Sequence, residues 1–229
     1  MTVTPSPPGT HVTLAEEVAL LSLDDESGAA RERQSAGWAV AGGILLELVM
    51  AERVAVADGR LSITDTTPTG VPLLDKRLEL LITWAKRGGK RRVTDWLTKD
   101  QSKAVSATVE SLCARGLVVE ERRKALGIFP LRRYPEADGT VERELRARLA
   151  AVVLEGAEPD VRTSGLVALL QGAKLYGLAF PDLPKKTVEP RMTEIASGQW
   201  AGDSLREAIR NMQAAMVAIT ATVVVTTMT

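Results

Sequence analysis

The residues best suited to do chemistry in this sequence are two clusters of basic side chains. The first places five positive charges within residues 86–92, around Gly88-Gly89. A loop with this charge can bind phosphate groups, and each cation contributes on the order of 1 kcal/mol at an anionic membrane. A solvated loop whose cations pair with acids elsewhere gives the same pattern. Of the two, we choose headgroup binding as the hypothesis to test, and its first candidate residues are Lys90, Arg91 and Arg92.

The second basic cluster surrounds a predicted β-hairpin. Positive residues 122–124 are expected at its turn, Arg132 and Arg133 on its second strand, and apolar residues beside them. This combination is typical of a hairpin that buries apolar side chains in a membrane interface, although charges that protect an edge strand from pairing explain it as well. The predicted membrane-contact or oligomerisation hairpin consists of Arg122, Arg123, Leu126, Ile128 and Phe129.

Residues for catalysis or metal binding are scarce. The only histidine, His11, lies in a Pro-rich segment (residues 1–12) predicted to be disordered, where a general base cannot be held within reach of its proton. The only cysteine, Cys113, is expected to be a buried, inert thiol. One His and one Cys do not make a zinc site. We therefore predict no enzymatic activity, no cofactor and no metal.

The composition is that of a globular protein without a strong overall charge. Hydrophobic residues make up 45% and aromatic residues only 3%, so the core must be built from aliphatic side chains, which favours packed helices. Lys+Arg and Asp+Glu both number 29, so binding to an anionic partner must come from a local patch. The start of the chain shows no signal peptide, and the apolar run 214–225 is shorter than the ~20 residues of a membrane helix. These features predict a cytoplasmic protein that associates with membranes peripherally.

Local signals in the first half predict several elements. Thr13 and Glu16 form a capping box that begins a helix. Residues 34–51 are apolar nearly all round, so this helix should be central. Asp58-Gly59 is the turn signal of a short hairpin, and Pro72 suits the first position of the next helix. A short helix from Thr94 and a separate helix over 101–115 follow, with strands at 117–120 and 128–134.

Further helices are predicted in the second half, over 141–154, 162–175, 185–197 and 203–222. Glu142–Arg146 and Glu144–Arg148 are expected to be ion pairs on the solvent side of the first of these. No stretch between residues 13 and 225 has the composition of a linker. The sequence therefore predicts a mainly α protein of eight or nine helices, with residues 13–229 as a single domain.

Several motifs, taken in order, resemble the Golgi phosphoprotein family. They are LAEEVALLSLDDESG (14–28), GGILLELVMAERV (42–54), PTGVPLLDKRLELL (68–81), SLCARGLV (111–118) after Trp96, and FPLRRYP (129–135). The resemblance implies a central four-helix bundle with amphipathic helices and a β-hairpin, and recognition of phosphatidylinositol 4-phosphate at a membrane. In eukaryotic members it implies adaptors that retain glycosyltransferases by their cytoplasmic tails. The family has bacterial relatives, and the Ala, Val, Arg and Gly bias of this chain fits a bacterial gene.

The sequence departs from the family at the lipid site. Alignment of the motifs puts Glu32, Ala41, Ser102 and Val105 where the family has one tryptophan and three arginines. The neighbouring residues Arg31, Arg33 and Lys103 are candidate replacement cations. We therefore expect weak or absent specificity for phosphatidylinositol 4-phosphate, with general binding of anionic lipid headgroups retained.

Two other classes of function remain open at this stage. A helix over 101–115 followed by a basic hairpin is typical of a winged-helix nucleic-acid binder, but that helix carries only Lys103 and Arg115 as cations. A purely structural or protein-interaction domain is the third reading. The expected partners are anionic membrane lipids, protein clients and a second copy of the chain through the hairpin, rather than nucleic acid.

Overall fold

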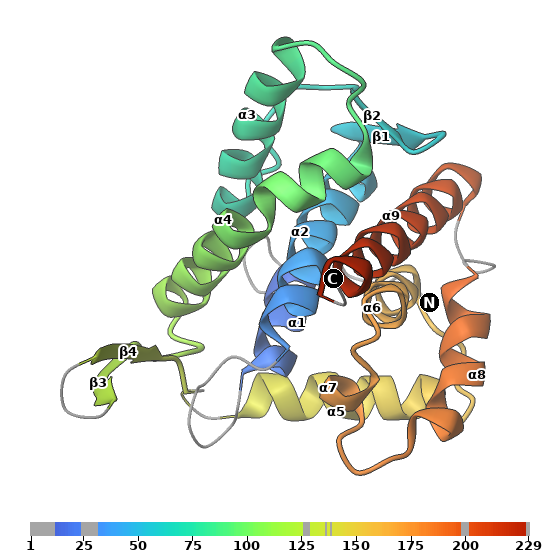
Figure 1. Cartoon of the computed structure of the whole chain (residues 1–229). Coiled ribbons are helices and arrows are strands. Elements are labelled where there is room, and N and C mark those ends of the chain that lie inside the picture. Colours follow the sequence, from blue (N-terminus) through green and yellow to red (C-terminus); the bar gives the residue numbers. More distant parts are fainter. Residues whose placement is uncertain are drawn as a thin grey trace, which may run out of the picture.

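The computed structural model describes residues 12–23, 32–125, 129–135, 137, 139–197 and 202–227. Over these ranges the chain forms nine helices and two antiparallel hairpins, which confirms the predicted mainly α class (Figure 1). The elements are α1 (Leu14–Ser22), α2 (Arg33–Met50), β1 (Val54–Ala57), β2 (Arg60–Ile63), α3 (Pro72–Lys86), α4 (Val93–Ala114), β3 (Glu121–Ala125), β4 (Phe129–Arg133), α5 (Thr140–Val153), α6 (Val161–Gly172), α7 (Tyr176–Ala179), α8 (Lys185–Ala196) and α9 (Asp203–Thr227).

Helix α2 lies at the centre of the molecule, as its apolar sequence predicts. Every residue from Ala36 to Leu48 is buried, and the helix packs against α1, α4, α6 and α9 (Figure 1). Two glycines permit this close packing. A Cβ at Gly43 would lie 2.8 Å from the backbone N of Ala15 in α1, and one at Gly42 would lie 2.5 Å from Cε of Met216 in α9.

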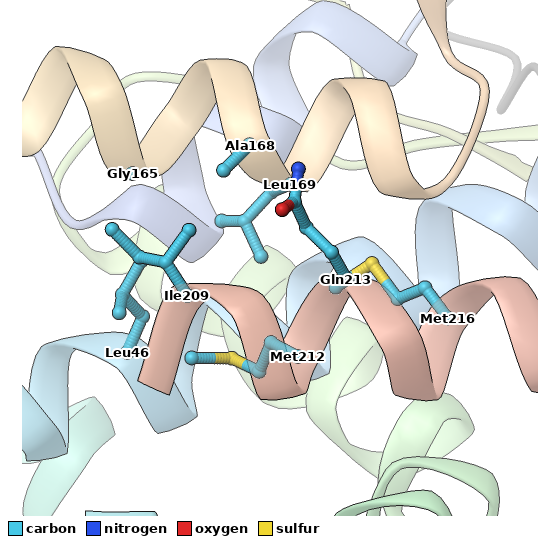
Figure 2. Close-up of a pocket in the computed structure, with 8 residues that line it drawn as sticks. All are labelled: Leu46, Gly165, Ala168, Leu169, Ile209, Met212, Gln213 and Met216. Atoms are coloured by element: carbon cyan, nitrogen blue, oxygen red, sulfur yellow. The ribbon is translucent and has the colours of Figure 1, made fainter. Parts of the chain in front are cut away.

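The seam between α6 and α9 is closed by side chains rather than hollow. Figure 2 shows Leu169 of α6 above Met212 of α9, with Leu46 of α2 beside Ile209 at the left. The space between these residues is too small to hold a water molecule. This seam belongs to the core and is not a ligand site.

The predicted hairpin with an Asp58-Gly59 turn is confirmed as β1–β2. Both turn residues have positive φ (50° and 69°), the backbone form that two-residue hairpin turns require. The Asn211 side chain of α9 accepts the Gly59 N–H at 2.7 Å, and Val56 and Leu61 are buried beneath. The hairpin is therefore fixed against α9.

Helix α4 corrects the prediction of two separate helices. It runs unbroken for 22 residues, from Val93 to Ala114. No Gly or Pro interrupts this stretch, and Asp100, a residue type that often begins a helix, instead pairs with Arg77 of α3. Both side chains are buried, and burial lowers the pKa of Arg77. This ion pair joins α3 to α4.

The second hairpin starts later than predicted. Leu117 lies in a bend, and residues 117–119 are joined to the far strand by isolated bonds, such as Val119 N–H to Pro135 O at 3.0 Å. The continuous ladder begins at Glu121, opposite Arg133, and its last pair is Ala125 with Phe129. Arg122 and Arg123 are therefore on β3 rather than at the turn, because they pair with Arg132 and Leu131 within the ladder.

Helix α5 lies across one end of the bundle, and its predicted solvent-side ion pairs are only partly correct (Figure 1). Arg146 does pair with Glu142, but Glu142 is buried, because the guanidinium lies over it and donates to the carbonyl oxygens of Leu178 and Ala179. The predicted Glu144–Arg148 pair is wrong among the described contacts, because Arg148 pairs with Glu17 of α1 at 2.8 Å.

Candidate anion-binding surface

The basic segment 86–92 forms the exposed connection between α3 and α4, at the top of Figure 1. Its five cationic side chains are all exposed, and none has an acidic partner within 4.0 Å among the residues that the structure describes. The indoles of Trp84 and Trp96 lie 5.3 Å apart and pack together at the base of this segment. The five charges therefore face solvent above this pair of indoles.

At its C-terminal end the basic segment is hydrogen-bonded to the β1–β2 hairpin, while its first residues continue the last turn of α3. Leu61 N–H donates to Arg91 O at 2.8 Å, and Val93 N–H donates to Gly59 O at 2.9 Å. These two bonds make Arg92 an isolated antiparallel bridge partner of Arg60 on β2. Near the other end, a Cβ on Gly88 or Gly89 would meet no atom within 4 Å. The segment thus has an open tip and a fixed C-terminal end.

Arg60 belongs to this basic surface but was not predicted from the sequence. It is exposed, and no acid lies within 4.0 Å of its guanidinium in the described part of the chain. The Asp58-Gly59 turn does predict that Arg60 begins a strand. Nothing in the local sequence reveals that a segment about 30 residues later pairs with that strand, so the juxtaposition with Arg92 could not be foreseen.

The structure does not bring the two basic clusters together. The segment 86–92 precedes α4 and the β3–β4 hairpin follows it, so the two lie at opposite ends of the helix (Figure 1). A helix of 22 residues is about 33 Å long. One phosphate cannot contact both clusters. Of the hairpin residues, the structure describes the backbone alone for Arg122, Arg123 and Phe129, while Leu126 and Ile128 lie outside the described residues.

The candidate replacement cations are also far from the basic segment. Arg33 is the first residue of α2, about 25 Å along that helix from the end that leads into β1. Lys103 is exposed on α4, two residues from both Gln101 and Val105, whose side chains face Gly37 of α2. Two residues correspond to about 200° of rotation on a helix. Lys103 therefore points away from α2, and Arg31 lies outside the described part of the chain.

The four positions aligned with the family's lipid site do not form a basic pocket. Glu32 is exposed at the N-cap position of α2, where its φ is 44° and its side chain makes no capping bond. Ser102 is exposed and Val105 is half-buried. Ala41 is 0% exposed inside the core, so a headgroup could not reach it. The four positions therefore lack both the positive charges of the family's lipid site and a pocket that could hold a headgroup.

Glu16 is the centre of a polar network. Its carboxylate accepts hydrogen bonds from Thr13 N–H (2.7 Å), from the Ser111 hydroxyl (2.8 Å) and from the Arg115 guanidinium (2.8 Å). The predicted capping box is confirmed, and the same carboxylate also ties α1 to the end of α4. Arg115 is partly exposed, and its positive charge is paired with the buried Glu16 carboxylate.

Two more buried carboxylates extend this network to the other helices. Glu47 of α2 accepts from Leu14 N–H at 2.9 Å and from the Arg162 guanidinium at 2.8 Å. Glu17 pairs with Arg148, yet burial raises the pKa of Glu17 above its usual value despite that charge. All three glutamates face arginines, so the network fixes α1 among α2, α4, α5 and α6. Sequence reasoning found the capping role of Glu16 and missed these long-range partners.

An open cleft of about 600 Å³ lies beside this network, between the start of α3 and the second half of α4. Asp75 closes the loop at its rim, because its carboxylate accepts the N–H groups of Thr69 (2.6 Å) and Gly70 (3.2 Å). The lining is mixed: Glu16, Thr69, Gly70, Val71, Pro72, Leu73, Lys76, Ala107, Glu110, Ser111, Ala114 and Arg115. Among these side chains the Ser111 hydroxyl donates to Glu16 at 2.8 Å, and the Arg115 guanidinium bonds to the same carboxylate.

The single cysteine does not resemble a catalytic thiol. Cys113 is half-buried rather than buried as predicted, and burial together with Glu120 and Glu110 raises the pKa of its thiol, which disfavours the reactive thiolate. Over the described ranges, no group of three or more His, Cys, Asp and Glu residues is arranged to hold a metal ion. No helix in these ranges is both long and apolar enough to cross a membrane.

The fold and this surface define a class: a mainly helical protein with an exposed cationic segment at one end of its bundle. The chain belongs to the Golgi phosphoprotein 3 (GPP34) family, whose model matches residues 14–212. The match runs from the first residue of α1 into α9 and so includes the basic segment. A comparison with curated proteins finds no match.

Proposed function

We propose that this protein is a non-catalytic, adaptor-type protein that binds anionic lipid headgroups at a membrane surface through the basic segment 86–92. The observation that carries the proposal is the exposure of five cations that have no acidic partner among the described residues. Membership of the Golgi phosphoprotein 3 family supports an adaptor-type role. The protein as a whole has no net charge, so attraction to a membrane depends on this local surface.

The mechanism is electrostatic attraction at short range. Each Lys or Arg near an anionic surface contributes about 1 kcal/mol, and the attraction decays within a Debye length of about 8 Å at physiological salt. The open tip at Gly88-Gly89 lets the cations adjust to headgroups. Because Glu32, Ala41, Ser102 and Val105 do not form a basic pocket, we expect no phosphatidylinositol 4-phosphate pocket at the family's positions.

The β3–β4 hairpin is a second contact in this proposal. It lies at the far end of α4, and Val119 at its base exposes 54% of its surface. An apolar contact there would add to the charge attraction at the basic segment. Binding of protein clients and self-association through this hairpin remain predictions of the same proposal.

Vesicle co-sedimentation tests the proposal. We expect wild-type protein to bind phosphatidylserine-containing vesicles but not neutral phosphatidylcholine vesicles, and to bind less as salt is raised from 50 to 200 mM. Changing Lys90, Arg91 and Arg92 together to Gln removes three cations, about 3 kcal/mol, and should weaken binding about a hundredfold.

The matched control changes Lys174, Lys185 and Lys186 to Gln. All three are exposed, at the end of α6 and the start of α8, so this variant loses the same charge at a distance from the basic segment. It should bind like the wild type. Equal losses in the two triple variants would mean that net charge, and not this surface, drives binding, and would overturn the proposal.

A further inference from the structure

The pairing of Arg60 with Arg92 gives this surface a feature beyond diffuse charge. The bonds from Leu61 N–H to Arg91 O and from Val93 N–H to Gly59 O flank the pair on both sides. This is the pattern of a non-hydrogen-bonded antiparallel pair, in which the Cα atoms are about 4.5 Å apart and the side chains are closest. Two guanidinium side chains therefore leave the backbone opposite each other.

The two arginines point to solvent and not into the core. Arg60 precedes the buried Leu61 on β2, where strand neighbours alternate between faces, and Arg92 precedes the buried Val93 that begins α4. Arg60 and Arg92 are exposed on the opposite face. The neighbour of Arg60 on β1 is Ala57, which offers no carboxylate.

Like charges directly opposite each other on paired strands destabilise the pairing. Nothing described in the chain relieves the repulsion here, since no acid lies within 4.0 Å of either guanidinium. Arg92 is also the N-cap of α4 and makes no side-chain capping bond, so the positive end of that helix adds to the local potential. A bound anion with several acceptor oxygens would relieve the repulsion.

We propose that Arg60 and Arg92 form a clamp for a phosphate monoester. A guanidinium donates two parallel hydrogen bonds to phosphate oxygens, and a monoester offers three terminal oxygens and close to two negative charges. Two facing guanidiniums match that charge and oxygen count. The ligand chemistry is carried by a lipid headgroup such as phosphatidic acid and equally by free phosphate. This inference names a site within the proposed membrane-binding surface and so rests on that function.

Charge-preserving variants test the clamp separately from general attraction. Lys keeps the positive charge but cannot make the paired bonds of Arg. Vesicles with phosphatidic acid and vesicles with phosphatidylserine are compared at matched surface charge, using the full chain. The wild type should prefer phosphatidic acid, and the double variant Arg60→Lys, Arg92→Lys should lose about tenfold in affinity for it while binding phosphatidylserine unchanged.

Inorganic phosphate, titrated by calorimetry at constant ionic strength, distinguishes the source of the ligand. Arg-dependent binding of phosphate without a preference for phosphatidic acid vesicles would support a clamp for a soluble phosphate. A Lys174→Arg, Lys186→Arg variant serves as a control that should change neither measurement. The clamp is overturned if the double Lys variant matches the wild type with both phosphate and phosphatidic acid. In that case a loss of binding in the Lys90, Arg91 and Arg92 variant would still leave the proposed function intact.

Discussion

At the scale of single residues, the interior is most sensitive where a glycine lets two backbones meet. Gly43 packs against the backbone of Ala15, which cannot move aside as a flexible side chain can. Gly42 instead faces the ends of the Met216 and Leu169 side chains. The two adjacent glycines therefore differ in how much a methyl group would disturb the fold.

We expect Gly43→Ala to destabilise the protein by about 1–3 kcal/mol, because the added methyl group forces α1 away from α2. This outcome opposes helix propensity, which favours Ala over Gly by about 1 kcal/mol. Urea unfolding measures the change. The control is Gly177→Ala in α7, where an added Cβ meets nothing within 4 Å. A Gly43→Ala protein as stable as the Gly177→Ala protein would show that α1 does not pack as described.

A second residue-scale prediction concerns Asp160, the N-cap of α6. Burial raises its pKa, but the lowering effects together outweigh burial: hydrogen bonds from the Thr163 N–H (2.6 Å) and the Thr163 side chain, and the charges of Arg148 and Arg162. The pKa of Asp160 is therefore lowered. A lowered folded pKa contributes stability above the unfolded value of 3.8 that is lost as pH falls through the folded value. Asp160→Asn keeps a capping oxygen but not the charge.

We therefore expect Asp160→Asn to be about 0.5 kcal/mol less stable than the wild type at pH 7, with the difference shrinking at pH 3. Urea unfolding at both pH values gives the comparison. Asp182→Asn, at an exposed position in a turn, is the control and should differ little at either pH. A difference for Asp160→Asn that grows on acidification would contradict the assignment.

At the scale of elements, sequence signals correctly predicted the features whose hydrogen bonds or backbone angles depend on neighbouring residues. The Thr13–Glu16 capping box, the Asp58-Gly59 hairpin turn and the start of α3 at Pro72 each depend on neighbouring residues, and all three are confirmed. The helix break predicted before Gln101 was wrong because the Asp100 side chain pairs with Arg77 of α3 and does not begin a new helix. The boundaries of β3 were wrong because strand pairing, and not composition, decides where a ladder begins.

The candidate site was predictable only in part for the same reason. The run of cations in residues 86–92 is visible in the sequence, and its exposure could be anticipated. The bridge between Arg60 and Arg92 depends on the tertiary contact of the α3–α4 connection with β2. Similarly, the i,i+4 spacing of Glu142 and Arg146 predicted their pairing but not that Glu142 would be buried under Arg146.

At the scale of the whole molecule, α1 and α9 share the same interior. Buried side chains from Leu14 in α1 to Ile219 in α9 belong to one hydrophobic cluster. Helix α9 packs on α2, α4, α6 and β1, so the last helix holds elements from the first half of the chain. We propose on this basis that residues 13–229 behave as a single domain.

Thermal unfolding should accordingly occur in one cooperative transition. The calorimetric enthalpy is expected to equal the van't Hoff enthalpy, since neither half can lose its packing without exposing the other. The far-UV circular dichroism should be dominated by helix and disappear in the same transition. Two separate transitions, or a spectrum dominated by strand, would refute the single-domain prediction.

The contact between Trp84 and Trp96 gives the protein an optical reporter of its own. The two indoles lie at the base of the basic segment, one on the last turn of α3 and the other on the first turn of α4. Any ligand that shifts these two helix ends changes the environment of both rings. Intrinsic emission can therefore follow occupation of this surface in unlabelled protein, and replacing either indole by Phe assigns the signal to this end of the bundle.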